Sequence, residues 1–124
     1  MQLDKRRIVI TGGFGTLGLA AVRAALGAGA QVVAIDRADP PAAGIDQATC
    51  IGGIDLADPQ SAQRALATAT QTLGGLDALV NIAGTFRYEN VADGNVDTWD
   101  LLYRINLRTA VAASQAAMKY LHAG

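Results

Sequence analysis

Short apolar runs alternate with longer amphipathic segments along the chain. The run Ile8-Val9-Ile10 is β-branched and stops at Thr11-Gly12-Gly13, which predicts a buried strand. A helix is predicted from about Thr16 to Gly29, because its apolar positions recur three and four residues apart until Gly27 and Gly29 end it. The apolar run that follows predicts a second strand over residues 31–36.

The rest of the chain continues this alternation. A weaker third strand is predicted over residues 49–54, and a fourth over residues 76–83. Between them, Asp58-Pro59 predicts an N-cap followed by proline in the first helical turn, and this helix should run to about Leu73. After a polar, irregular stretch over residues 85–94, one long helix is predicted from about Val96 to Leu121.

The order of these elements predicts an α/β fold. Buried strands without in–out alternation, separated by helices, favour parallel pairing with both faces covered. We therefore expect a Rossmann-type, doubly wound parallel sheet in a three-layer α/β/α arrangement, formed by one domain over residues 1–124. A ligand should bind at the carboxyl ends of the strands, near the switch in strand order. We also expect the first strand to lie at an uncovered edge of the sheet.

Composition narrows the classes of function. The net charge is −1 and no basic stripe is visible, so nucleic acid is not an expected partner. No apolar run approaches the roughly 20 residues that span a bilayer, so we expect no membrane association. Cys50 is the only cysteine, which excludes an internal disulfide and a cysteine-based metal site and favours a reducing, cytoplasmic location. His122, the only histidine, is expected at the surface, and we expect no metal.

A glycine-rich turn between the first strand and the first helix is the strongest local signal. It contains the pattern G-x-G-x-x-G at Gly13, Gly15 and Gly18. Glycines allow a tight turn and let the backbone approach a pyrophosphate, whose charge then faces the helix N-terminus. A turn that serves packing alone is the alternative. The candidate cofactor-binding residues here are Gly12, Gly13, Phe14, Gly15, Thr16, Leu17 and Gly18.

Asp36 at the end of the second strand is the second signal. An acidic residue there can accept hydrogen bonds from both hydroxyls of an adenosine ribose, and its charge repels a 2′-phosphate. Asp36 therefore favours NAD over NADP as the cofactor. Arg37 opposes this interpretation, since an arginine could pair with that phosphate. A solvated carboxylate at the strand end is the alternative role for Asp36.

The segment after the fourth strand resembles a known family. Asn81-Ile82-Ala83-Gly84 resembles the Asn-Asn-Ala-Gly signature of short-chain dehydrogenases/reductases, with Ile82 in place of the second Asn. The resemblance extends from about Lys5 to the last residue. Gly12 and Gly18 match the family's Thr-Gly-x-x-x-Gly-x-Gly turn, whose middle Gly falls on Thr16. In the Thr-Gly-x-x-Gly-x-x-Gly form of extended and atypical members, Gly15 matches as well.

The resemblance implies roles for further residues. Asn81, Ala83 and Gly84 would belong to the cofactor site, and Asp55 and Leu56 would contact the adenine, although Asp55 as a turn residue is the alternative. In the family, an Asn at the place of Asn106 holds a water of the proton relay. Asn has a low propensity for a helix interior, so its presence there favours a functional role over the alternative of a solvated polar residue. Phe86, Arg87 and Tyr88 would border the nicotinamide and substrate, or anchor the loop.

The resemblance also implies the activity of the complete protein. We expect an NAD-dependent oxidoreductase that transfers hydride between nicotinamide and a small carbonyl or alcohol substrate. The family's catalytic Ser and Tyr-x-x-x-Lys would come after Gly124, and no Tyr here has a Lys four residues on, so Asn106 is the one expected catalytic residue. We therefore expect a domain incomplete at its C-terminus, from a protein about twice as long. A non-catalytic dinucleotide-binding module and an extended-type epimerase or dehydratase are the alternatives.

The last predicted helix suggests an oligomer. Its apolar residues lie on more than one face, and one sheet face cannot cover them all: Leu101, Leu102, Ile105, Leu107, Val111, Ala112, Ala116 and Met118. Family members usually pair through this helix and the next one. We expect a homodimer or homotetramer.

Overall fold

Four parallel strands form one sheet in the order β3-β2-β1-β4. The computed structural model describes residues 3–122. The strands are β1 (Arg7–Thr11), β2 (Gln31–Ile35), β3 (Thr49–Ile51) and β4 (Ala78–Asn81). In register, Val9 lies opposite Val33 on one side and Leu79 on the other. Strand order switches direction at β1, which places the carboxyl ends of β1 and β4 beside a crevice where α/β proteins bind ligands.

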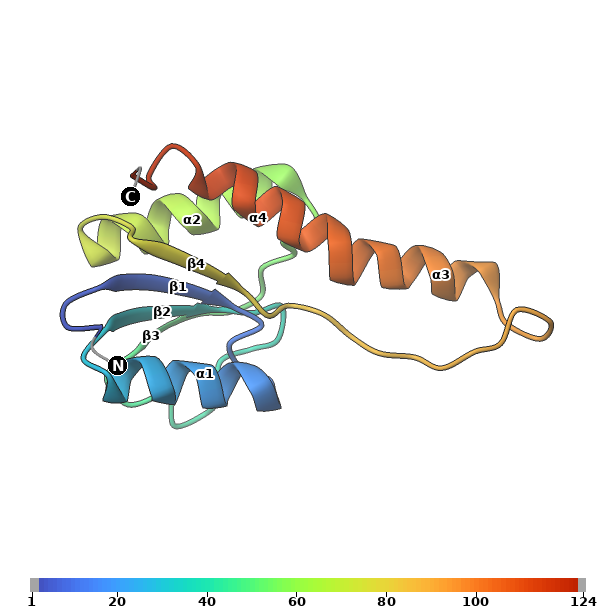
Figure 1. Ribbon diagram of the computed structural model, residues 1–124, viewed down its shortest axis with the longest axis horizontal. Helices are drawn as coiled ribbons and strands as arrows, with labels where there is room; N and C mark the ends of the chain where they lie inside the picture. The colour runs from blue at the N-terminus through green and yellow to red at the C-terminus, as the bar shows by residue number, and fades with distance from the viewer. Residues whose placement is uncertain (1–2, 123–124) are drawn as a thin grey trace.

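Side chains alternate between the two faces of the sheet and fill two cores. Val9, Val33 and Ile35 belong to the core under α2 (Pro59–Leu73) and α4 (Thr109–Ala117). Ile8, Ile10, Val32 and Ala34 belong to the core under α1 (Thr16–Gly27). Figure 1 shows α1 on one face and α2 and α4 together on the other. The predicted three-layer α/β/α class is confirmed.

The start and end of α2 form as the sequence predicts. The Asp58 carboxylate caps the helix by accepting the Ser61 N–H at 3.1 Å, and Pro59 occupies the first turn. Gly74 ends the helix in the left-handed conformation, at φ +75°. α1 stops two residues earlier than predicted, at Gly27, while Gly29 takes the positive φ that turns the chain towards β2.

Three predictions about the strands were wrong. β1 is not an edge strand, because β2 and β4 pair with its two sides, and the open edges belong to β3 and β4. β3 ends at Ile51 rather than at residue 54, since Gly53 adopts φ +70° and breaks the extended chain. β4 is shorter than residues 76–83, because the Ile82 and Ala83 N–H groups leave the ladder and donate to Thr11 Oγ1.

The long helix predicted over residues 96–121 forms as three consecutive pieces. These are α3 (Val96–Leu102), a π-helical segment η1 (Tyr103–Arg108) and α4, which ends at Ala117. Polar side chains accompany the wide turn. Asn106 Nδ2 donates to the Leu102 carbonyl at 2.9 Å, and Thr109 Oγ1 donates to the Ile105 carbonyl at 2.6 Å. Side-chain bonds to carbonyls one turn back favour such local departures from α-helical geometry.

The segment after β4 and the helix α3 extend away from the sheet (Figure 1). α3 buries none of its residues. Large apolar side chains are therefore exposed here, among them Phe86, Tyr88, Val96 and Trp99. Within residues 3–122, no helix has the length and apolar character needed to cross a membrane.

Candidate functional site

A cleft of about 420 Å³ lies at the carboxyl ends of the strands. Eleven of the fifteen predicted site residues line it, together with residues from the loop before α2, the segment after β4, η1 and the start of α4. The lining residues from the prediction are Gly12, Gly15, Thr16, Leu17, Gly18, Asp36, Arg37, Asp55, Leu56, Ala83 and Gly84. The structure therefore brings together, from four segments, residues that lie far apart in the sequence.

The glycine turn is shaped by two close backbone approaches. Gly12 has φ +64°, and a Cβ there would lie 2.7 Å from the Ala83 nitrogen. A Cβ on Gly18 would collide with the Gly12 carbonyl. Gly15 differs from both, since its Cβ would meet only the Gly12 oxygen at an ordinary 3.6 Å and its backbone is extended. Gly12 and Gly18 thus serve the fold, while a side chain at Gly15 would take up space in the cleft.

The N-terminus of α1 opens into this cleft. Gly15 is the N-cap and, within the described chain, no side chain caps the first turn of α1. Thr16, Leu17 and Gly18 of that first turn line the cleft. The leading N–H groups of a helix have no partner within it and carry a partial positive charge. The first turn of α1 therefore presents donors that suit an anionic group such as a pyrophosphate.

Gly13 and Phe14 lie behind the turn and outside the lining. A Cβ on Gly13 would meet Ala34 Cβ at 2.6 Å, so this glycine lets the turn pack on β2. The Phe14 side chain packs against the core under α1, while its N–H donates to Asp36 at 2.9 Å. The glycine pattern of the sequence therefore combines residues that face the cleft with residues that hold the turn.

Asp36 lies just past the end of β2, is half-buried and lines the cleft. One carboxylate oxygen accepts the Phe14 N–H and the other accepts the Ala38 N–H at 3.0 Å. Each oxygen keeps a second lone pair for a ligand donor. Arg37, next in the chain, is exposed and also lines the cleft.

The end of β4 is fixed by a threonine that the sequence analysis did not single out. Thr11 is buried, and its Oγ1 accepts the N–H groups of both Ile82 and Ala83, at 3.1 and 3.2 Å. Asn81 is not among the residues that line the cleft, and its Nδ2 donates to Ser114 Oγ on α4 at 3.1 Å. The predicted site residues of this segment thus divide into Asn81, which has a structural role, and Ala83 and Gly84, which line the cleft beside Ile82.

Asn106 ties the turn after β4 to η1. Its Oδ1 accepts the Thr85 N–H at 3.0 Å, while its Nδ2 donates to Leu102. Gly84 makes room for this contact, because a Cβ there would lie 2.7 Å from Asn106 Oδ1. Asn106 does not itself line the cleft, but it fixes two residues, Gly84 and Thr85, that do.

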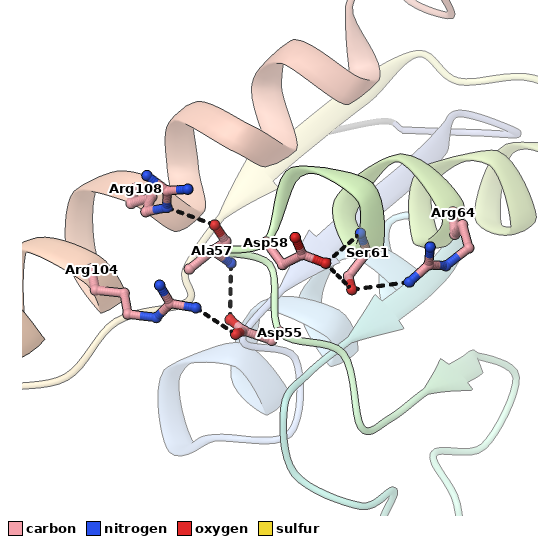
Figure 2. Close-up of polar contacts among 7 residues, drawn as sticks. All are labelled: Asp55, Ala57, Asp58, Ser61, Arg64, Arg104 and Arg108. Carbon is pink, nitrogen blue, oxygen red and sulfur yellow. Dashed lines mark hydrogen bonds and ion pairs between the residues drawn. The ribbon is translucent and has the colours of Figure 1, made fainter.

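Asp55 is paired with an arginine that sequence reasoning missed. Arg104 Nη2 on η1 lies 2.7 Å from Asp55 Oδ2, and both residues line the cleft. Figure 2 shows the contact between the two side chains. Burial opposes ionisation of Asp55, but the hydrogen bonds from Arg104 and from the Ala57 N–H outweigh it and lower the pKa of this carboxyl. Arg108, one turn further along η1, donates to the Ala57 carbonyl at 2.7 Å. The four-residue spacing of the two arginines is visible in the sequence, but the loop they reach is not.

The cleft combines a helix N-terminus, two carboxylates and apolar walls from Ile54, Leu56 and Ile82. This combination suits an elongated ligand with an anionic centre and hydroxyl or amino donors at one end. Within residues 3–122, no group of three or more His, Cys, Asp or Glu side chains could hold a metal ion.

Comparisons with known proteins agree with this geometry. The sequence model of the short chain dehydrogenase family matches residues 6–124. The 2-(S)-hydroxypropyl-CoM dehydrogenase 3 of Xanthobacter autotrophicus is 34% identical, in a match that covers 94% of this chain and 49% of that protein. The sorbitol dehydrogenase of Cereibacter sphaeroides is 30% identical, over 100% of this chain and 50% of that protein. The chain thus spans about half the length of these curated relatives.

Solved structures of short-chain dehydrogenases also resemble this chain, and it again covers about half of each. A short-chain dehydrogenase from Burkholderia cenocepacia in complex with NADP superposes with a TM-score of 0.83 and 32% identity, covering 98% of this chain and 53% of that one. A short-chain dehydrogenase/reductase from Serratia marcescens has a TM-score of 0.82 and 29% identity, covering 98% of this chain and 55% of that one.

Proposed function

The chain belongs to the short-chain dehydrogenase family, and on this premise we propose that the protein is an NAD-dependent oxidoreductase acting on a small carbonyl or alcohol substrate. The nicotinamide of the cofactor supplies or accepts the hydride when it is bound. The residues of this chain hold and orient the cofactor. The proposal rests most directly on the cleft at the carboxyl ends of β1 and β4. The first turn of α1 and the Asp36 carboxylate both line this cleft, so one ligand can contact both.

The residues present fit a dinucleotide. The open first turn of α1 offers N–H donors to a pyrophosphate, and Gly15 keeps the approach free of side chains. Thr16, Leu17 and Gly18 would surround the same group. Gly12, Gly13 and Phe14 would act by shaping the turn, because their contacts are with Ala83, Ala34 and Asp36.

The cofactor preference follows from Asp36. We propose that its carboxylate accepts hydrogen bonds from the adenosine ribose and that its charge disfavours a 2′-phosphate, so NAD binds more tightly than NADP. Arg37 beside it is the feature that would favour NADP, and the Burkholderia relative was solved with NADP. Asp36 is held in place by the Phe14 and Ala38 N–H groups, whereas Arg37 is exposed, so we give Asp36 the larger effect.

Of the remaining site residues, some would contact the cofactor and one would take part in the reaction. Asp55 and Leu56 would meet the adenine, while Ala83 and Gly84 would lie along the ribose and nicotinamide side. Asn81 would support this side from behind through Ser114. Asn106 would belong to the catalytic group by holding a water of the proton relay, and it would also fix the turn at Thr85.

We also propose a homodimer or homotetramer. Four apolar side chains spaced four residues apart form a half-exposed stripe along α3, η1 and α4: Trp99, Tyr103, Leu107 and Val111. Residues four apart lie on one helix face. A second copy of the chain is the partner that would cover this stripe.

A pair of glycine variants tests the cofactor site. Gly15→Val should fold, since its backbone is extended and its Cβ has room, yet it should obstruct the pyrophosphate and weaken NAD binding by at least tenfold. Gly27→Val, at the far end of α1 with open space around it, is the matched control and should bind NAD as the unmodified protein does. Calorimetric titration measures both, with circular dichroism to confirm folding. Unchanged NAD affinity in a folded Gly15→Val protein would contradict the proposed site.

A further inference from the structure

The carboxylate of Asp55 is held by two different parts of the fold. Oδ1 accepts the Ala57 N–H of its own loop at 3.0 Å, and Oδ2 accepts Arg104 Nη2 from η1 at 2.7 Å. Figure 2 shows the two bonds approaching the carboxylate from the loop and from the helix. With both oxygens tethered, the carboxylate plane is fixed, and each oxygen keeps a lone pair for a further donor.

This ion pair has little to contribute to stability. The Arg104 and Asp55 side chains are 48% and 44% exposed, and ion pairs that exposed are screened by water. The loop is also anchored independently, because Arg108 Nε holds the Ala57 carbonyl. What Arg104 adds is the orientation of a charged acceptor at the wall of the cleft.

Arg37 does not supply the same orientation. It lowers the pKa of Asp55 through its charge alone, whereas Arg104 also donates a hydrogen bond to the carboxylate. Arg104 comes from η1, the segment that also carries Asn106 and its bond to Thr85. The position of Asp55 is therefore set from the same segment that fixes the turn after β4.

We infer that Arg104 is a positioning residue that fixes Asp55 to accept a hydrogen bond from the 6-amino group of the cofactor's adenine, and thereby selects this base; the inference rests on the proposed function. Adenine presents a donor at this position, whereas a 6-oxo purine such as hypoxanthine presents an acceptor. An ionised carboxylate can only accept, so it attracts the amino group and repels the oxo group. The preference for adenine depends on the orientation of the Asp55 carboxylate. Arg104 fixes this orientation through its hydrogen bond.

The test compares NAD with nicotinamide hypoxanthine dinucleotide by calorimetric titration of the full chain. The unmodified protein should bind NAD about tenfold more tightly than the hypoxanthine analogue, the effect of one hydrogen bond to a charged group. Arg104→Gln should reduce this ratio to about threefold or less. Arg104→Lys, which keeps the charge but not the fork of donors, should retain more of the ratio.

Two further variants separate positioning from other effects. Arg64→Gln removes an arginine bound to Ser61 outside the cleft, and it should leave the ratio unchanged. Asp55→Ser keeps an acceptor for the Ala57 N–H but removes the charge, and it should reduce the ratio by itself. Adding Arg104→Gln to Asp55→Ser should then cause no further loss, because the two residues act as one unit.

The outcomes distinguish this inference from the proposed function. If Arg104→Gln weakens both dinucleotides equally, or neither, the ratio is unchanged and the positioning role is overturned while the cofactor site stands. If the unmodified protein binds neither dinucleotide, the proposed function falls, and the inference falls with it. Circular dichroism on each variant confirms that a loss of binding reflects the site rather than unfolding.

Discussion

Asp36 and Phe14 are joined by a 2.9 Å hydrogen bond in which the carboxylate of Asp36 accepts the backbone N–H of Phe14. This bond fastens the glycine turn to the end of β2. Because the other carboxylate oxygen holds the Ala38 N–H, the orientation of Asp36 is set by the protein itself. A preformed acceptor of this kind avoids the entropy cost of ordering a side chain on binding.

Gly18 should be the least replaceable glycine of the turn. A Cβ there would collide with the Gly12 carbonyl, and no side-chain rotation can relieve the clash because the backbone fixes the positions of both groups. We expect Gly18→Ala to lower the free energy of unfolding by about 3 kcal/mol, as overpacking against backbone does. Gly15→Ala is the control, since its Cβ has ordinary contacts, and it should stay within about 1 kcal/mol of the unmodified protein. Urea titration measures both, and equal stabilities would contradict the geometry of the turn.

The Arg7–Asp77 pair should make stability depend on pH. Hydrogen bonds from the Arg7 guanidinium and from its backbone N–H hold the pKa of Asp77 well below its usual range. A depressed folded-state pKa stabilises the protein fully above the unfolded pKa of about 4, and this stabilisation is lost as the pH falls towards the folded pKa. Asp77→Asn should therefore lower Tm at pH 7, with a smaller difference at about pH 3.

Asp46 provides the control for this prediction. It is exposed, and within residues 3–122 it forms no ion pair or side-chain hydrogen bond. Asp46→Asn should leave Tm unchanged at both pH values. A Tm difference for Asp77→Asn that stays constant between pH 7 and pH 3 would show that ionisation of Asp77 does not contribute to stability.

Asn106 should protect the Thr85 amide from exchange. Its Oδ1 is the acceptor for that N–H, and a hydrogen bond contributes about 1 kcal/mol net. Asn106→Ala should therefore speed hydrogen exchange of the Thr85 amide about fivefold, while the amides of β1 exchange as before. Hydrogen exchange followed by NMR gives both rates in one experiment. Equal Thr85 rates in the two proteins would mean that Asn106 does not hold this turn in solution.

The exposed stripe on α3, η1 and α4 should hold the proposed oligomer together. Leu107 and Val111 form its C-terminal half, and each is about half exposed. Val111→Glu would place a charge in an apolar interface and should shift a dimer or tetramer to monomers at micromolar concentration. Gln63→Glu, at an exposed position of α2, should leave the assembly intact. Sedimentation measures the masses, and a monomeric unmodified protein would refute the proposed assembly.

The sequence predicted most of the fold because the periodic signals were strong. The β-branched runs and the capping pair Asp58-Pro59 depend on local chemistry, and their elements form within a few residues of the predicted bounds. The position of β1 was mispredicted, since strand order depends on pairing between distant segments. The π-helical turn at Asn106 was missed as well, because it accompanies side-chain bonds to carbonyls that a helical periodicity does not reveal.

The candidate site could be predicted where its residues belong to a motif whose local structure fixes their relative positions. The turn from Gly12 to Gly18 and the acidic residue at position 36 reach one cleft because a strand and a helix fix their separation. Arg104 and Thr11 were not predicted, since each acts on a partner in a distant part of the chain, Asp55 and the end of β4. Such pairings follow from the tertiary arrangement rather than from local pattern.

The affinity of the protein for NAD relative to NADP, measured by calorimetric titration of the unmodified chain and of Asp36→Asn, tests the central claim most directly. Asn keeps an acceptor oxygen for the Phe14 N–H but removes the charge. The account predicts tighter binding of NAD to the unmodified protein and a gain in relative NADP affinity of about tenfold in Asp36→Asn, from the lost charge repulsion. Tighter binding of NADP to the unmodified protein, or a ratio that Asp36→Asn leaves unchanged, would contradict it.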